Sequence, residues 1–202
     1  MAFGVYKSIE EVAKKYQITV AVELFVQPAP ITIAEHFEPD LAYVLKHMDV
    51  KMSEASISEF LIAPILKEIW KHYGDSLLLW SHVALSVGEE FDGYPDYLFT
   101  KRTPLGLVRD KPYVLVVEAK KDDFEGGWGQ CLAAMLAAQK INDNEQVILQ
   151  GSVSNGEVWQ FGKLQGRDFA RDPRPFTILN LASLFAALHG VFECAKQQAQ
   201  KS

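Results

Sequence analysis

The stretch Lys111–Gln139, KPYVLVVEAKKDDFEGGWGQCLAAMLAAQ, decides how the rest of the chain is interpreted. Its first part, Val114–Val117, is a short apolar run that follows Pro112, which predicts a strand buried on both faces of a sheet. An acidic and glycine-rich segment, Asp122–Gly129, then interrupts the apolar pattern. A helix rich in alanine is predicted from about Trp128 to Lys140. The stretch therefore predicts a central strand followed by a helix whose small residues allow it to lie close to the sheet.

Charged side chains at the end of this strand are expected to share one pocket. Because side chains alternate along a strand, Glu118 and Lys120 project from the same face, about 7 Å apart by the rise per residue. Asp96 lies at the edge of another predicted strand, 22 residues before Glu118. That is enough chain for a hairpin to bring the two acids together.

Three parts of the sequence form a recognisable pattern: Pro95-Asp96, then Glu118–Lys120, then a helix that carries Gln130. Together they resemble the PD-(D/E)XK nuclease superfamily, which has the restriction-endonuclease-like fold. The resemblance extends over about residues 53–162. Within it, the proline before the acid and the apolar residues after it favour Asp96 over the nearby Asp92.

The resemblance implies an α/β fold: a three-layer α/β/α sandwich around a mixed sheet of four to five strands. Residues 1–202 are interpreted as one domain, which length alone permits. The nuclease-like core is residues 53–164, preceded by a strand and helix extension (1–52) and followed by a loop and C-terminal helix (165–202). One residue departs from the pattern: Ala134 stands where exonuclease-type members carry a tyrosine, which argues against the RecB-like group.

The resemblance also implies a metal site. Asp96, Glu118 and the carbonyl oxygen of Ala119 would bind Mg²⁺ (or Mn²⁺), a hard cation that suits oxygen ligands. Glu59, on the first core helix, would add a further ligand. Because Ser56-x-x-Glu59 is also a capping-box pattern, the alternative is that Glu59 caps a helix running from Ser56 to about Tyr73. Pro64 is expected to kink that helix.

The implied activity is metal-dependent phosphodiester hydrolysis of nucleic acid, with DNA favoured over RNA. Lys120 would position the attacking water or stabilise transition-state charge, and Gln130 would orient the nucleophile. The alternatives are a non-catalytic nucleic-acid-binding protein that keeps the fold, and an interaction subunit that needs a partner.

Charge is distributed unevenly. The net charge is −6, with 7 basic and 15 acidic residues in 1–96 (−8) and 13 basic and 11 acidic in 97–202 (+2). Binding of nucleic acid over the whole surface is therefore not expected, because it depends on phosphate neutralisation. A local basic cluster near the motif predicts phosphate contacts from Lys101, Arg102 and Lys121.

The remaining elements follow from periodicity and turn signals. The predicted elements are a helix at Ile9–Tyr16, a half-buried strand at Ile18–Val26, a helix at Pro39–Met48, a hairpin of Leu77–Val87 with Phe91–Thr100, strands at Gln146–Val153 and Val158–Leu164 around Asn155-Gly156, a charged loop at Asp168–Pro175 and a helix at Ile178–Gln200. The last helix carries a broad apolar stripe, interpreted as core first and as a homodimer or partner surface second.

Cysteine usage and the absence of a leader pattern predict a cytoplasmic protein with no membrane segment. Cys131 and Cys194 each lie in an apolar helical pattern and are expected to be packed thiols. They form neither a disulfide framework nor a metal-ligand cluster.

Overall fold

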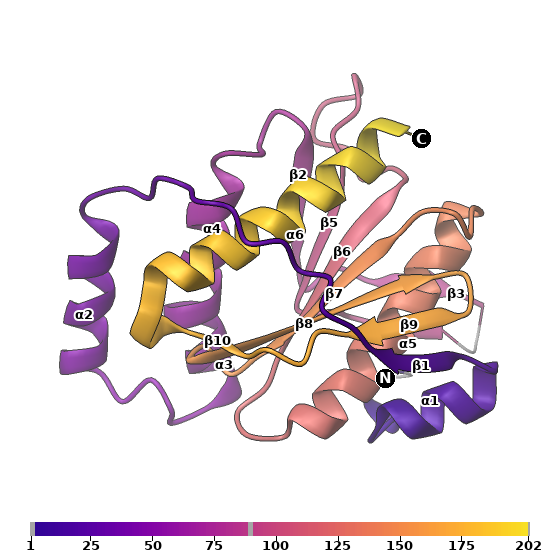
Figure 1. The fold of residues 1–202 in the computed structure, drawn as a ribbon, viewed down its shortest axis with the longest axis horizontal. Helices are drawn as coiled ribbons and strands as arrows, with labels where there is room; N and C mark the ends of the chain where they lie inside the picture. Colours follow the sequence, from indigo (N-terminus) through magenta and orange to yellow (C-terminus); the bar gives the residue numbers. More distant parts are fainter. Residues whose placement is uncertain (1–2, 89–90, 202) are drawn as a thin grey trace.

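The computed structural model describes residues 3–88 and 91–201 (Figure 1). The strands are β1 (Thr19–Val22), β2 (Leu77–Ser81), β3 (Leu85–Val87), β4 (Phe91–Gly93), β5 (Tyr97–Lys101), β6 (Tyr113–Ala119), β7 (Leu149–Ser154), β8 (Val158–Gln165), β9 (Asp168–Arg171) and β10 (Phe176–Thr177). The α-helices are α1 (Ile9–Tyr16), α2 (Phe37–His47), α3 (Glu54–Ile57), α4 (Ala63–Trp70), α5 (Phe124–Asn142) and α6 (Leu181–Lys201). A π-helical turn, Ser58–Ile62, joins α3 to α4, and 3-10 turns occupy Phe3–Val5 and Ile178–Asn180.

The chain forms a mixed α/β structure around a large mixed sheet of eight strands. Seven of them run in the order β1-β9-β8-β7-β6-β5-β2, and β10 pairs with β8. Strand β6 pairs antiparallel with β5 and parallel with β7, and all seven of its residues are buried. The prediction of a central strand at this position is confirmed.

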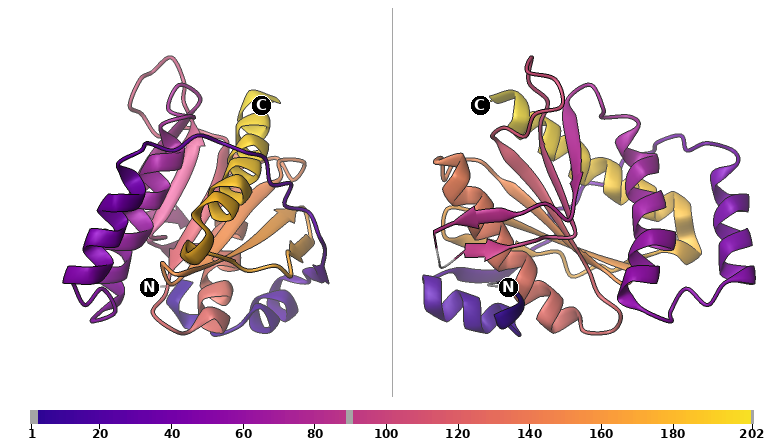
Figure 2. Two further views of the ribbon diagram at one scale, coloured as in Figure 1. Left: turned by 60° about the vertical axis from the view of Figure 1, so that its left-hand side comes forward. Right: turned by 180° about the vertical axis from the view of Figure 1, so that it is seen from behind.

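Helices cover both faces of the sheet, with α4 and α6 on one side and α1 and α5 on the other (Figure 2). Alternate residues of β6 belong to the two cores: Leu115 and Val117 pack under α6, whereas Val116 packs under α5. Burial on both faces explains why this strand is apolar without alternation in the sequence. Hydrophobic packing on both faces of β6 holds in position the end of the strand that carries Glu118.

The sheet has eight strands, whereas the sequence predicted four to five. The additional strands lie at one end: β1 comes from the predicted N-terminal extension, and β9 and β10 come from the segment 165–202, which was predicted to be a loop and a helix. The prediction of a loop at Asp168–Pro175 is therefore wrong for Asp168–Arg171, which form β9, and correct for the rest of that segment. Strand β9 has only two buried residues, Phe169 and Ala170, between charged ends, so its composition hides the pairing with β8 and β1.

The predicted strand Ile18–Val26 is shorter than expected, and its apolar side is not buried. Only Thr19–Val22 form a strand, and all four residues are exposed. Ile18 and Val26 are buried, but the three alternate apolar side chains between them lie at the surface. The strand is the last in the sheet order, and among the described strands it pairs only with β9.

The predicted hairpin forms in two pieces. Strands β2 and β5 pair in the main sheet, and β3 and β4 form a separate two-stranded sheet. His82, which has a positive φ of 52°, lies at the break between the pieces. Glu89 and Glu90 of the predicted turn lie outside the described residues.

The helix predicted from Ser56 begins earlier. Ser53, not Ser56, is its N-cap, and the Oγ of Ser53 accepts a hydrogen bond from the amide of Ser56. The capping-box interpretation of Glu59 is therefore wrong. Because Pro64 has no N–H to donate, the helix widens into the π turn just before it, where the amide of Ala63 donates to Ser58.

The C-terminal helix confirms the prediction for Ile178–Gln200. Its stripe is used in the chain's own core: Leu184, Phe185, Leu188, Val191, Phe192 and Ala195 are all buried. By length and composition alone, Ile178–Lys201 is also long and apolar enough to cross a membrane, a test that core helices of globular proteins pass as well.

Candidate functional site

The site lies where β5 begins and β6 ends. Tyr97 is in register with Val117, so the antiparallel pair places Asp96 beside the end of β6. The Asp96 Oδ2 atom accepts a hydrogen bond of 2.7 Å from the amide of Ala119. The expectation that a hairpin unites the two acidic segments is correct. The competitor Asp92 is exposed on β4, in the other sheet.

Glu118 and Lys120 face the same space, as strand alternation predicted. The Nζ atom of Lys120 lies 3.2 Å from the Oε1 atom of Glu118 and 3.3 Å from the Oε1 atom of Glu54. The side chains of Lys120 and Glu118 are 11% and 9% exposed, whereas that of Glu54 is 49% exposed. The cluster is therefore a mostly buried ion-pair group, open on the side of Glu54, in which one ammonium is shared by carboxylates from a strand and from α3.

The surroundings of Glu118 disfavour a negative charge on this side chain in addition to the charge of Asp96. Burial, together with repulsion from Asp96, raises the pKa of Glu118 to about 8, although Lys120 partly offsets this effect. Burial also raises the pKa of Asp96, against the opposing effects of the Ala119 amide, Lys120 and His82. Burial alone would lower the pKa of Lys120, but the carboxylates around it outweigh that effect and raise its pKa.

His82 is a neighbour that the sequence did not reveal. Its Nε2 atom lies 3.3 Å from the Oδ1 atom of Asp96, and the amide of His82 donates to the main-chain oxygen of Asp96. Its Nδ1 atom lies 2.7 Å from the hydroxyl of Ser81. The break between β2 and β3, where His82 has its positive φ, brings this imidazole to the acid. No spacing in the sequence indicated this contact.

Glu59 lies next to the site but not inside it. It is exposed and lines a surface pocket together with His82 and Tyr97. The first-helix acid that contacts Lys120 is Glu54, five residues earlier. The sequence indicated an acid on this helix, but the early helix start and the π turn change which residue points at the strand end.

Gln130 is half-buried in the second turn of α5, not in the first. The helix begins at Phe124, where Asp123 is the N-cap and accepts a hydrogen bond of 2.8 Å from the amide of Gly126. Among the described residues, no hydrogen bond joins Gln130 to Glu118 or Lys120. Gly127, one turn before Gln130, is packed against Lys120 so closely that a Cβ there would lie 2.7 Å from the Lys120 Cγ.

The predicted basic residues do not lie together. Lys121 directly follows Lys120 and is exposed. Lys101 ends β5 at the opposite end from Asp96, about 16 Å away by the rise of a five-residue strand. Arg102 is there too, where it donates to the carbonyl oxygen of Gly74. The basic cluster inferred from sequence proximity is thus split between the two ends of the sheet.

The donors at the site suit a hard divalent cation. Asp96 and Glu118 are two converging carboxylates whose mutual repulsion a cation would relieve, and the third predicted ligand is a main-chain oxygen, that of Ala119. Within residues 3–88 and 91–201, no group of three or more His, Cys, Asp or Glu side chains could hold a metal ion. The predicted ligand set therefore depends on the contribution of the main chain.

Neither a family model nor a curated protein matches this chain.

Proposed function

We propose that the chain is a metal-dependent phosphodiesterase of the PD-(D/E)XK type that acts on nucleic acid. The observation that carries the proposal is the hydrogen bond from the Ala119 amide to Asp96. It joins the Pro95-Asp96 segment to the Glu118–Lys120 segment at one strand end. Two sequence fragments 22 residues apart thereby become one group of a buried carboxylate, a half-buried carboxylate and an ammonium.

The order of elements supports the same proposal. A helix (α3 to α4) is followed by β2, β5 and β6, then by α5, then by β7 and β8. These five strands are neighbours in the order β2-β5-β6-β7-β8, with helices on both faces. We interpret this subset as the three-layer core of four to five strands that the resemblance implies, with three further strands added at one edge.

The residues divide the chemistry among them. Asp96, Glu118 and the Ala119 carbonyl would hold Mg²⁺ or Mn²⁺, which supplies Lewis acidity and positive charge when bound. Lys120 is held at the site by Glu118 and Glu54, so its ammonium is positioned to stabilise negative charge that develops on a phosphoryl group. His82 fixes the orientation of Asp96. Lys121, which is exposed beside the site, would contact a phosphate of the substrate.

The test is cleavage of labelled single- and double-stranded DNA and RNA in Mg²⁺ and in Mn²⁺. We expect wild-type protein to cleave at least one substrate, and Glu118→Gln to abolish cleavage while the chain stays folded. Glu59→Gln is the matched control, because it removes an exposed acid beside the site and is expected to keep most of the activity. Cleavage that survives Glu118→Gln, or that chelation does not stop, contradicts the proposal.

One observation favours the alternative of a non-catalytic nucleic-acid-binding or interaction protein. Lys120 bridges Glu118 and Glu54, so the carboxylates already have a cationic partner. In that case the ion pairs would serve stability alone. Wild-type protein that binds nucleic acid but cleaves no substrate, with or without metal, would support this alternative.

A further inference from the structure

The outer edge of β1 is available for pairing. β1 is the last strand in the sheet order, and in the described parts of the chain no strand pairs with its other side. The amides of Thr19 and Glu23 donate to the β9 side, to the carbonyl oxygens of Arg167 and Arg171. Because backbone groups of alternate residues point to opposite sides of a strand, those of Val20 and Val22 point to the open side. Leu24 lies two residues beyond the end of β1 and continues this alternation, because the amide of Phe25 donates to the side chain of Asp172, which follows β9.

The same three residues carry apolar side chains that the monomer leaves in water. Val20, Val22 and Leu24 are 47%, 68% and 63% exposed. They share a strand face with Ile18, which is buried in the core beneath α1 and α5. An alternating apolar row at a strand is typical of a buried face, yet here only its first member is covered. The row and the open edge together form an unpaired and apolar strand.

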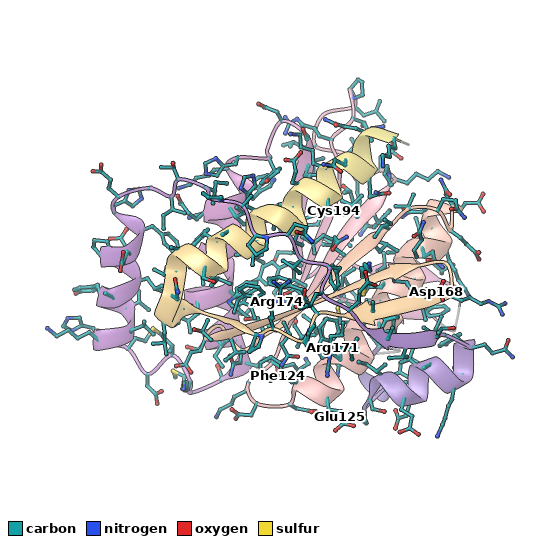
Figure 3. The ribbon with its side chains drawn as sticks, viewed as in Figure 1. Phe124, Glu125, Asp168, Arg171, Arg174 and Cys194 are labelled. Carbon is teal, nitrogen blue, oxygen red and sulfur yellow. The ribbon has the colours of Figure 1, made fainter. Side chains whose placement is uncertain are left out.

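This apolar surface continues inward from the edge. Val20 and Val22 form the floor of a pocket of about 640 Å³ between α1 and the N-terminal end of α5. Figure 3 labels three residues of its lining, Phe124 and Glu125 on α5 and Arg171 on β9. A strand added beside β1 would extend the floor of this pocket with its own alternate side chains.

We propose that β1 pairs antiparallel with β1 of a second copy of the chain, with the two-fold axis at Val22. In this register Val22 faces its own counterpart, and Val20 faces Leu24 of the second copy. All three outward-pointing residues then form hydrogen-bonded pairs, each of which exchanges two bonds, so about six backbone hydrogen bonds cross the interface. A register centred on Ala21 would satisfy only two such pairs, because Leu24 would then face Ile18, whose amide already donates to Ala13.

The edge is self-complementary in charge as well. In the proposed register Glu23 faces Ala21 of the second copy, so no acid lies opposite an acid. Glu23 also has an internal partner, since the Nζ atom of Lys163 lies 2.8 Å from its Oε1 atom. The apolar side chains meet one another across the axis, which is the favourable cross-strand arrangement. A second copy is therefore the occupant that the edge itself specifies.

The contact is small, so the dimer is expected to be reversible. The strand pair involves five residues on each side. It is expected to bury less surface area than the roughly 1,000 Å² of a stable interface. The pairing is independent of the nuclease proposal and uses a surface other than the apolar stripe of α6, which is buried within the chain. It joins two sheets into one continuous sheet across the two-fold axis.

The test is sedimentation velocity over a series of protein concentrations. We expect a dimer fraction that rises with concentration, and a dissociation constant at least tenfold weaker in Val22→Lys, because like charges would face each other at the axis. Leu179→Lys is the matched control: it adds the same charge at a site that is 95% exposed, and it is expected to leave the equilibrium unchanged. A monomer at every concentration up to about 1 mM, the range of the weakest specific binding, overturns the proposal.

Cross-linking tests the register. In a Cys194→Ser background, Val22→Cys should cross-link with a short bifunctional maleimide, since paired Cα atoms lie about 5.5 Å apart. Val20→Cys should not, because the two copies of residue 20 would be about 13 Å apart along the strands. Cys131 is buried and stays unreactive. Dimers that persist in Val22→Lys, or equal cross-linking of both variants, would place the contact elsewhere and overturn the proposal.

Discussion

Replacement of Glu118 by glutamine should change how the stability of the metal-free protein depends on pH. The Glu118 carboxyl is nearly buried and faces Asp96, Lys120 and Glu54. Burial and the charge of Asp96 raise its pKa from the usual value of 4.5 to about 8. In the folded protein this carboxyl therefore keeps its proton at pH values where the unfolded chain has lost it.

The sign and size of the effect follow from proton linkage. Between pH 4.5 and about 8 the folded state binds more protons at this group than the unfolded state, so the free energy of unfolding falls as pH rises. Each pKa unit is worth about 1.36 kcal/mol, so the fall amounts to at most about 5 kcal/mol across this window. The raised pKa of Asp96 adds to the fall in the same direction.

The assay is urea denaturation in a chelator at closely spaced pH values from 5 to 9. Wild-type protein should lose stability through this range, and Glu118→Gln should lose much less, because its amide does not titrate. Glu59→Gln, an exposed acid beside the site, should follow the wild-type curve. A wild-type stability that is flat from pH 5 to 8, or equal slopes for wild type and Glu118→Gln, would refute the described electrostatics.

Three further predictions concern other parts of the chain. Asp172 is fully buried and ion-paired with a neighbouring arginine; its pKa is about 2, since hydrogen bonds outweigh burial. Asp172→Asn should cost about 2–3 kcal/mol in chemical denaturation above pH 4, and the wild type should lose this contribution as pH falls from 4 to 2. Gly190→Ala should lower the melting temperature, because a Cβ there would collide with main chain crossing α6, whereas Gly4→Ala has open space and should not. In nucleic-acid binding, Lys121→Ala should reduce the slope of log affinity against log salt concentration by about 0.9, while Arg102→Ala should not change this slope for short substrates. Equal effects of the two substitutions would contradict the location of Lys121 and Arg102 at opposite ends of the sheet.

Local signals in the sequence predicted the centre of the fold. The helix predicted at Ile9–Tyr16 forms with these bounds, and the side chain of Asn155 accepts hydrogen bonds in the turn predicted between β7 and β8. The apolar run of β6 indicated its burial on both faces. These features depend on contacts between residues close in the sequence, or on the apolar character of a buried strand, so the local sequence is enough to predict them.

What the sequence did not reveal depends on long-range pairing and helix rotation. Strand β9 is held between β8 and β1, so its pairing depends on partners far away in the chain rather than on its own charged composition. Glu54 replaces Glu59 at the site because the helix begins at Ser53 and widens before Pro64. Lys101 is near Glu118 in sequence, but β5 runs away from the site.

Lys120 offers the most direct test of the account, because it separates catalysis from metal binding. An ammonium supplies no metal ligand, so Lys120→Ala should still bind Mn²⁺, yet lose about 2.7–4 kcal/mol of transition-state stabilisation, as when one preorganised donor is deleted. The measurement is the single-turnover rate of phosphodiester cleavage at saturating Mn²⁺, for wild type and Lys120→Ala. The account predicts a rate lower by a factor of about 100 to 1,000 in the variant. An unchanged rate, or no cleavage by the wild type of any DNA or RNA, would contradict it.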